Sequence, residues 1–217
     1  MKKEWYAPNK LEAYGEEEIK AVEQCLRDGW LAGFGPRSVE FEEKIAKEFG
    51  KKYGVFVNSG SSACLLSLAA LDLPKGTKVL TPALTFSTTL APIIQLGYVP
   101  VFIDSNLTSY VPDVDDIIEA VTDDIKVIMI PNLIGNKPDW KKLKDELFRI
   151  NRSDIYLIED SADTVTYTKE SDVSTTSFYA SHVITAGGMG GMVMFNDEKH
   201  VKRALMYRDW GRIGDNS

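Results

Sequence analysis

One stretch of sequence decides the fold of this chain: Tyr53-Gly54-Val55-Phe56-Val57, followed at once by Asn58-Ser59-Gly60-Ser61-Ser62. The first five residues are mostly β-branched or aromatic, which is typical of a strand. The small polar residues that follow predict a turn. The apolar run 63–71 then predicts a helix. A strand that passes through a tight turn into a helix is the repeating unit of α/β folds.

The same alternation continues along the rest of the chain. The patterns predict strands at 78–81, 99–103, 125–130, 155–158 and 191–195, and helices at 11–27, 39–49, 87–96, 114–120, 140–148 and 198–207. The predicted strands are nearly continuous apolar runs, which favours a mostly parallel sheet covered on both faces. We therefore expect one domain over residues 1–217, a three-layer α/β/α sandwich around a mostly parallel mixed sheet.

Two of the predicted helices precede the first strand, and each carries apolar residues at helical spacing. In the helix 11–27 these residues are Ile19, Val22 and Leu26. In the helix 39–49 the candidate core contacts are Val39, Ile45, Ala46 and Phe49.

The composition is that of an ordinary globular protein. The 217 residues are 44% hydrophobic and 26% charged, which suffices for one sizeable core. No apolar run approaches the roughly 20 residues that cross a bilayer, so we expect a cytoplasmic protein with no membrane partner. The net charge of −7 gives no electrostatic reason to expect nucleic acid as a partner. Cys25 and Cys64 lie in unrelated segments, which favours two reduced thiols over a disulfide.

The turn after the first strand is a candidate phosphate site. Gly60 lets the backbone approach an anion, and the start of the helix directs N–H groups toward it. Ser61 and Ser62 can add hydroxyl donors. Taken alone, such residues more often form a plain helix cap.

Two further residues stand at the ends of predicted strands. Asp160, within Ile158-Glu159-Asp160-Ser161-Ala162-Asp163, lies where open α/β sheets bind ligands, and its alternative role is a helix N-cap. Phe86 ends the connection Thr81-Pro82-Ala83-Leu84-Thr85-Phe86, and by itself it would be interpreted as a core residue.

The segment that indicates a function is Ser177-Phe178-Tyr179-Ala180-Ser181-His182, followed by Thr185-Ala186-Gly187-Gly188-Met189-Gly190-Gly191. It is similar to the cofactor-lysine segment of the DegT/DnrJ/StrS family of pyridoxal-phosphate sugar aminotransferases. In that family a lysine five residues after the serine binds the cofactor as a Schiff base, and here that position is His182. An imidazole cannot form this stable bond, but it can move a proton near neutral pH.

The resemblance implies a cofactor, pyridoxal 5'-phosphate (PLP) or pyridoxamine 5'-phosphate (PMP), and assigns residues to it. The turn with Gly60, Ser61 and Ser62 matches the family's phosphate-binding turn. Ser177 would donate a hydrogen bond to the same phosphate. The resemblance also implies that the strand 191–195 runs antiparallel to its neighbour.

The ring of the cofactor would be held by three more residues. Phe86 matches the aromatic side chain that stacks on the pyridine ring. Asp160 matches the aspartate that pairs with the protonated ring nitrogen, which keeps the ring able to accept electrons. Asp163 matches a position near the ring where aminotransferases commonly have glutamine or histidine.

A histidine at position 182 resembles the family's 3-dehydratases, which use PMP to remove the C3 hydroxyl of a nucleotide-diphospho-4-keto-6-deoxyhexose. His182 would then be the catalytic base. Asp163 also resembles that branch, and the loop Pro131-Asn132-Leu133-Ile134-Gly135-Asn136 resembles it in part, because Lys137 intervenes before Pro138. The implied partners are a nucleotide-sugar substrate, glutamate as amino donor and a second copy of the chain in a homodimer.

Two alternatives remain open. The first is a nucleotide-sugar aminotransferase with a lysine elsewhere, although the closest lysines along the chain, Lys169 and Lys199, do not stand at the required position. The second is an inert half-enzyme that binds cofactor or a partner chain, because family members continue into a smaller C-terminal domain.

The chain departs from the family at two places. Gly188-Met189 stands where a glutamate usually lies between glycines. One dehydratase subgroup binds an iron–sulfur cluster through cysteines that begin after a sequence like Arg208-Asp209-Trp210-Gly211-Arg212, and no cysteine follows here. We therefore predict no cluster and no other metal. Arg212 could contact a nucleotide phosphate or form a surface salt bridge, and His200 fits a solvated helix face without a role.

Overall fold

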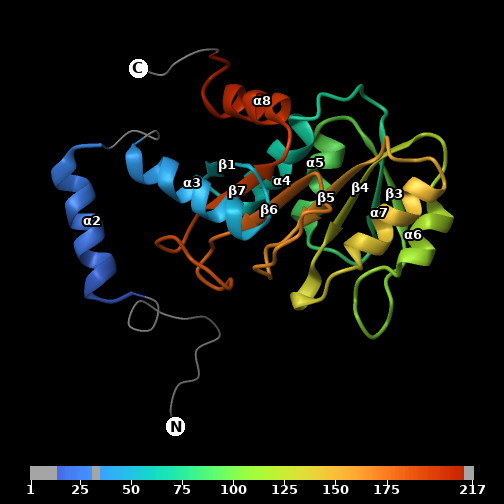
Figure 1. The fold of residues 1–217 in the computed structure, drawn as a ribbon, viewed down its shortest axis with the longest axis horizontal. Helices are drawn as coiled ribbons and strands as arrows, with labels where there is room; N and C mark the ends of the chain where they lie inside the picture. The colour runs from blue at the N-terminus through green and yellow to red at the C-terminus, as the bar shows by residue number, and fades with distance from the viewer. Residues whose placement is uncertain (1–13, 31–34, 213–217) are drawn as a thin grey trace, which may run out of the picture.

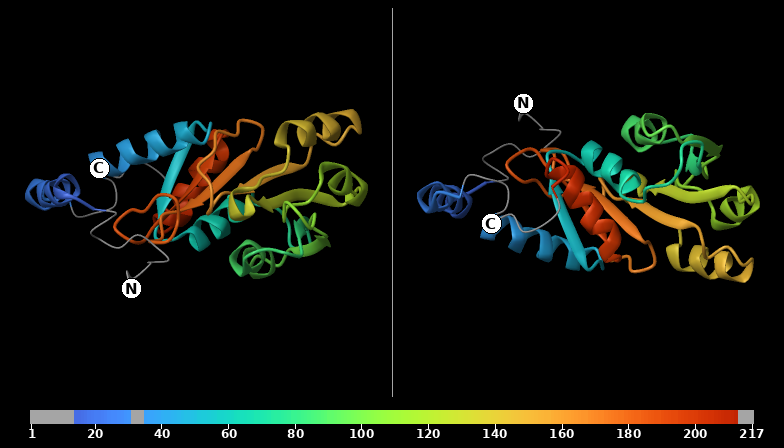
Figure 2. Two further views of the ribbon diagram at one scale, coloured as in Figure 1. Left: turned by 90° about the horizontal axis from the view of Figure 1, so that it is seen from below. Right: turned by 90° about the horizontal axis from the view of Figure 1, so that it is seen from above.

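The computed structural model describes residues 14–30 and 35–212, so the start of the expected helix at 11–13 and the residues after Arg212 lie outside this range. In the described part, a seven-stranded sheet lies between two layers of helices (Figures 1 and 2). Its strands are β1 (Tyr53–Val57), β2 (Lys78–Pro82), β3 (Val99–Ile103), β4 (Ile125–Pro131), β5 (Tyr156–Asp160), β6 (Val173–Ser177) and β7 (Gly191–Phe195). Its helices are α2 (Glu16–Asp28), α3 (Pro36–Glu48), α4 (Gly60–Ala69), α5 (Ser87–Gln95), α6 (Val114–Ala120), α7 (Trp140–Arg149) and α8 (Glu198–Arg208), with the short 3₁₀ helix η1 (Leu133–Gly135).

The strands of the sheet follow the order β1-β7-β6-β5-β4-β2-β3. Strands β2 to β6 pair in parallel, whereas β7 is antiparallel to both of its neighbours, β1 and β6. The mostly parallel mixed sheet and the antiparallel direction of β7 are thus confirmed. Because the carboxyl ends of β2 to β6 meet at one edge, the residues that follow these strands are brought together there.

Alternate residues of the strands pack into two separate hydrophobic cores, one on each face of the sheet. On β4, Val127 and Met129 pack toward α4, α5 and α8, whereas Ile128 and Ile130 pack toward α6 and α7. The helix α3 covers the β1–β7 end of the sheet on the same side as α7, where Phe49 is fully buried (Figure 2). The three-layer α/β/α arrangement follows from this strand periodicity.

The first two described helices differ in how much they bury. In α3, Ile45 and Ala46 are buried, and Phe49 directly after the helix is too, but Val39 is 46% exposed, so its predicted core position is wrong. Phe41 of α3 packs edge-on against Phe56 of β1, so α3 lies on the sheet from Phe41 onward. No residue of α2 is buried, and Figure 1 shows this helix beside the main body.

The strand β6 was not predicted from the sequence. Its residues Val-Ser-Thr-Thr-Ser lack an apolar pattern, yet all five are buried. Their hydroxyl groups are used inside the protein: Ser174 donates to Glu159, Thr175 to Asp160 and Thr176 to the carbonyl of Ser161. A strand rich in hydroxyls can be central to a sheet when each hydroxyl has a buried partner.

His200 is not on a solvated helix face, and that prediction is wrong. Its side chain is only 5% exposed and packs edge-on against Tyr156, with ring centroids 5.4 Å apart. The helix α8 lies on the sheet through His200, Val201 and Ala204, because residues at this spacing share one helix face. Burial lowers the pKa of this imidazole.

The described helices are each too short or too polar to cross a bilayer. Within 14–30 and 35–212, no three histidine, cysteine or acidic side chains come close enough together to bind a metal ion. Both cysteines are free thiols.

Candidate active site

A cavity of about 900 Å³ opens at the carboxyl ends of the parallel strands. Seven of the eight residues assigned from the sequence line it: Gly60, Ser61, Phe86, Asp160, Asp163, Ser177 and His182. They come from five separate segments between the start of α4 and the loop before β7. The eighth residue, Ser62, does not line this cavity but a neighbouring groove beside α4 and α8.

The start of α4 forms the candidate phosphate site. Ser59 is the N-cap, and its hydroxyl oxygen accepts a hydrogen bond from the backbone N–H of Ser62 at 3.1 Å. Ser59 Oγ also lies 3.1 Å from Ser62 Oγ, so both hydroxyls take part in the cap. The helix is therefore capped and at the same time presents its N-terminus to the cavity, where Gly60 and Ser61 lie.

Gly60 permits a close approach between this turn and the end of β6. A Cβ atom at Gly60 would lie 2.7 Å from the Cβ of Ser177, which is closer than real Cβ atoms come. Ser177 is 7% exposed and its Oγ accepts from the backbone N–H of Tyr179 at 3.3 Å. Its hydroxyl hydrogen can accordingly be donated into the cavity, beside the start of α4.

Asp160 forms the floor of the cavity. It is the last residue of β5 and no helix begins after it, so the N-cap alternative does not apply. Its two carboxylate oxygens accept hydrogen bonds from Thr89 Oγ1 at 2.8 Å and Thr175 Oγ1 at 3.1 Å. Burial raises the pKa of this carboxyl, and these hydrogen bonds act in the opposite direction.

His182 lies in the wall of the cavity, on the loop between β6 and β7. Its backbone N–H donates to the carbonyl of Tyr179, and the two side-chain rings meet edge-on with centroids 5.9 Å apart. Its Nδ1 atom is buried and has no hydrogen-bond partner among the described residues. A buried polar atom without a partner is rare in folded proteins, and this one belongs to a side chain that lines the cavity.

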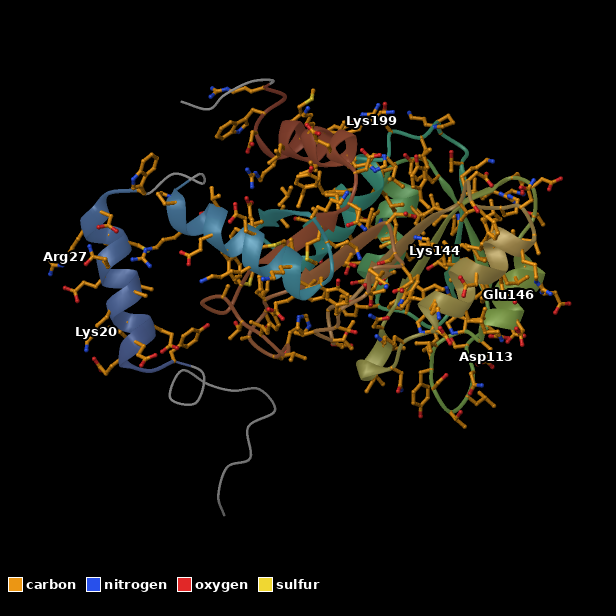
Figure 3. All side chains as sticks on the ribbon, viewed as in Figure 1. Lys20, Arg27, Asp113, Lys144, Glu146 and Lys199 are labelled. Carbon is orange, nitrogen blue, oxygen red and sulfur yellow. The ribbon has the colours of Figure 1, made fainter. Side chains whose placement is uncertain are left out.

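No lysine is among the described residues that line the cavity. Lys169 and Lys199 are both exposed. Lys199 lies on α8 and Lys144 on α7 (Figure 3), and neither lines the cavity.

Phe86 and Asp163 complete the set assigned from the sequence. Phe86 is 69% exposed in the cavity wall, so its alternative as a core residue does not hold. Asp163 is exposed, and its Oδ2 accepts a hydrogen bond from the backbone N–H of Ile134 at 3.4 Å. The loop 131–136 thereby reaches the cavity, where Leu133 and Ile134 line it.

Several lining residues were missed from the sequence. Cys64 and Tyr110 line the cavity, and Thr89 and Thr175 stand behind Asp160. Tyr110 adopts a left-handed conformation with φ of 62°, which a bulky side chain seldom adopts, and this is not visible in the sequence. The threonines gave no signal because their contacts join α5 and the unpredicted strand β6 to β5.

The basic residues at the end of α8 and after it, Arg208 and Arg212, lie outside the cavity. Arg208 is paired with Glu42 at 2.6 Å and with Asp209 at 3.0 Å. The guanidinium of Arg212 lies over the ring of Trp210 at 5.3 Å. Neither residue lines the candidate active site.

The fold and the cavity together define a class, an open α/β sheet with a ligand site at the carboxyl ends of its strands. The family model of the DegT/DnrJ/EryC1/StrS aminotransferase family matches residues 12–216, and the chain belongs to this family. The resemblance inferred from the segment around His182 is thus confirmed.

Three known proteins show how similar the chain is to characterised relatives. It is 34% identical over 212 residues to the GDP-4-keto-6-deoxy-D-mannose 3-dehydratase of Escherichia coli O55:H7, covering 90% of this chain and 53% of that protein. It is 30% identical over 202 residues to the GDP-perosamine synthase of Escherichia coli O157:H7, covering 90% and 54%. A crystal structure of GDP-4-keto-6-deoxymannose-3-dehydratase with a trapped PLP-glutamate geminal diamine has a TM-score of 0.86 at 29% identity, covering 96% and 55%. The chain spans about half the length of the relatives it matches.

Proposed function

We propose that this chain is the cofactor-binding part of a PMP- or PLP-dependent enzyme that removes the C3 hydroxyl of a nucleotide-diphospho-4-keto-6-deoxyhexose. The observation that carries the proposal is His182, which stands in the cavity wall where the family's aminotransferases have a lysine. The 3-dehydratase among its relatives, at 34% identity, supports the same reaction class.

The described residues fit the cofactor. The start of α4 with Gly60 and Ser61 can bind a phosphate group, and Ser177 can donate a hydroxyl hydrogen to it. Phe86 offers an exposed ring to cover one face of a planar ligand. Asp160 offers a buried carboxylate to a protonated ring nitrogen. When bound, such a cofactor supplies an amine and a ring that accepts electrons.

His182 would move the proton that the reaction requires. Its partly exposed side chain lines the cavity, so the imidazole can meet a ligand there. An imidazole takes up and releases protons near neutral pH, whereas a lysine amine would compete for the cofactor in a covalent bond. None of the described residues that line the cavity is a lysine, so none of them would hold the cofactor in a covalent bond.

We further propose that the chain works as a homodimer, with glutamate as amino donor and a cytoplasmic location. Large apolar side chains stand exposed around the cavity: Leu84, Phe86, Tyr110, Ile134, Tyr179 and Met189 are each at least 44% exposed. Apolar surface gathered in this way is typical of an interaction site, and a second copy of the chain can cover it.

A borohydride trapping experiment tests the central claim. The purified chain is incubated with PLP, reduced with borohydride and examined by mass spectrometry, with the variant His182→Lys beside it. We expect no covalent adduct on the wild type, slow conversion of bound PLP toward the PMP absorbance on adding glutamate, and a reduced adduct on the introduced lysine of the variant. A specific adduct on a lysine of the wild type would contradict the proposal.

The aminotransferase alternative is supported by the GDP-perosamine synthase among the relatives, which is named for an amino sugar. It requires a lysine that reaches the cofactor, and the trapping experiment would identify that lysine. An inert half-enzyme is the remaining alternative, because the chain covers only about half of its relatives. That alternative predicts cofactor binding without conversion of the sugar.

A further inference from the structure

The carboxylate of Asp160 is enclosed by side chains from three separate elements. Thr89 on α5 donates to one oxygen at 2.8 Å, and Thr175 on β6 donates to the other at 3.1 Å. Cys64 on α4 places its Sγ 3.6 Å from Thr175 Oγ1. Thr89 and Thr175 are fully buried and Cys64 is 2% exposed, so water does not replace these contacts.

The backbone determines the direction of these hydroxyl groups. Asp160 and Thr175 are direct partners in the parallel pairing of β5 and β6, so their side chains lie on the same face of the sheet. Threonine is branched at Cβ and has few χ1 rotamers, which makes a hydroxyl on a buried strand a rigid donor. The Cys64 thiol stays protonated, because burial first and the charge of Asp160 second raise its pKa.

The enclosure holds no cationic side chain within the described part of the chain. Among the described residues that line the cavity, the acidic side chains are Asp160 and Asp163, and none of the lining residues is lysine or arginine. A buried carboxylate paired with an arginine has its charge neutralised within the protein, whereas one held by neutral hydroxyls keeps its charge for a ligand. The floor of the cavity is therefore built to receive a cationic group.

We propose that Thr89 and Thr175, with Cys64 behind Thr175, are positioning residues that hold the Asp160 carboxylate ionised and aimed at a cationic ring nitrogen in the cavity. This inference rests on the proposed function, since the nitrogen would belong to the pyridine ring of the cofactor. The two threonines act through Asp160 and do not themselves touch the ring.

The first test needs no cofactor. The carboxyl carbon of Asp160 is titrated by ¹³C NMR in the full chain and in the variants Thr89→Val and Thr175→Val, which keep the shape and remove one donor each. Burial already raises the pKa of Asp160, and loss of a donor to the charged form should raise it further. Thr175→Ser should restore the wild-type titration, because serine returns the hydroxyl.

A matched control lies one residue away. Thr176 on the same strand is 4% exposed and donates to the backbone carbonyl of Ser161 at 2.9 Å, so Thr176→Val removes a buried hydroxyl that does not touch Asp160. We expect this variant to leave the Asp160 titration unchanged. If Thr176→Val and Thr175→Val shift it equally, or neither shifts it, the proposal is overturned.

The second test uses two ligands, PMP and its analogue with a carbon in place of the ring nitrogen. Thr175→Val should weaken PMP binding about tenfold, because a carboxyl that is protonated more readily and held less firmly pairs less well with the ring cation. Binding of the analogue should change less than twofold, since it offers nothing to the carboxylate. Equal weakening of both ligands would mean a general structural role and would overturn the proposal.

Failure of the proposed function has a different signature. In that case the wild-type chain would bind PMP no more tightly than its carbon analogue, while the NMR titration would still separate Thr175→Val from Thr176→Val. Such a result supports the action of the threonines on Asp160 and rejects the pyridine ring as the cation.

Discussion

His182 carries the choice between two reactions because its imidazole lines the cavity. The cavity offers Asp160 and Asp163 as acidic groups, but only His182 has a buried nitrogen without a partner in the described residues. A base that is already hydrogen-bonded inside the protein must break that bond before it moves a proton, and His182 has no such bond at Nδ1.

Replacement of this imidazole should therefore remove turnover and spare binding. If the proposed function holds, His182→Gln should lower the rate at which a nucleotide-diphospho-4-keto-6-deoxyhexose is consumed by about 10²–10⁴-fold, the usual contribution of a general base. Bound PMP, measured by its absorbance, should change little. The control is His200→Gln, since His200 is a buried residue of α8 that does not line the cavity. A comparable loss of turnover in the control would contradict the assignment.

The buried amine of Lys51 leads to a prediction about how the stability of the fold depends on pH. The residue is 5% exposed, and its amine donates to the backbone carbonyls of Thr168 and, at 3.4 Å, Phe49. Burial lowers its pKa from 10.5 to about 8, against the attraction of Glu159. The unfolded chain thus holds this proton more tightly than the folded chain, so the ammonium opposes folding below pH 8 and its opposition fades between pH 8 and 10.5.

The free energy of unfolding should accordingly rise through this window in a way that depends on Lys51. Urea unfolding at several pH values gives the free energy of unfolding of the wild type and of Lys51→Met. The wild-type value minus the variant value should increase from pH 8 to 10.5. The exposed neighbour provides the control, and Lys52→Met should show no such trend. A constant difference for Lys51→Met would refute the explanation.

At the scale of elements, the active site depends on how closely β7 approaches the turn before α4. A Cβ atom at Gly191, the first residue of β7, would lie within 3.0 Å of the backbone of Ser59 and Gly60. Ser59 and Gly190 form a bridge at the same place. Ser59 and Gly190 are 131 residues apart in sequence, and the glycines allow the two segments to meet without a side chain between them.

Gly191→Ala should consequently disturb both stability and the phosphate site. We expect a loss of about 1–3 kcal/mol in the free energy of unfolding, as for other overpacked interiors, together with weaker PLP binding. Gly76→Ala is the comparison, because Gly76 has open space around it and only the strain of φ at 85°. That variant should lose about 1–2 kcal/mol and bind PLP normally. If Gly191→Ala binds PLP like the wild type, the close approach does not shape the site.

The strand–helix alternation was predictable because apolar strands and helical spacing are local signals. The helix α6 was predicted at 114–120 and β7 at 191–195, and both are found there. The strand β6 was not, because its hydroxyl residues resemble a loop until their partners on β5 are known. The same limit applies to the site: the motif identified His182 and Asp160, but Thr89 and Thr175 are recognisable only from the pairing of distant segments.

At the scale of the whole molecule, α2 presents an apolar stripe that the described part of this chain does not cover. Ile19, Val22 and Leu26 are 57%, 62% and 64% exposed, although they share one face of the helix. The opposite face carries polar residues, among them Lys20 and Arg27, whose side chains Figure 3 shows pointing away from the body. An amphipathic helix with an uncovered stripe gains free energy when a second surface buries it, about 1.5–3 kcal/mol for each large apolar side chain.

If the proposed homodimer uses this stripe, a charge within it should separate the copies. We expect the wild-type chain to sediment at twice the mass of a single chain at micromolar concentration. Val22→Glu and Leu26→Glu should each raise the dissociation constant at least tenfold, because each removes apolar burial and places a carboxylate in a dry contact. Lys20→Glu introduces a carboxylate on the polar face of the same helix and should leave the association unchanged. A wild-type chain that stays monomeric, or a Lys20→Glu variant that dissociates as readily as Val22→Glu, would exclude α2 from the interface.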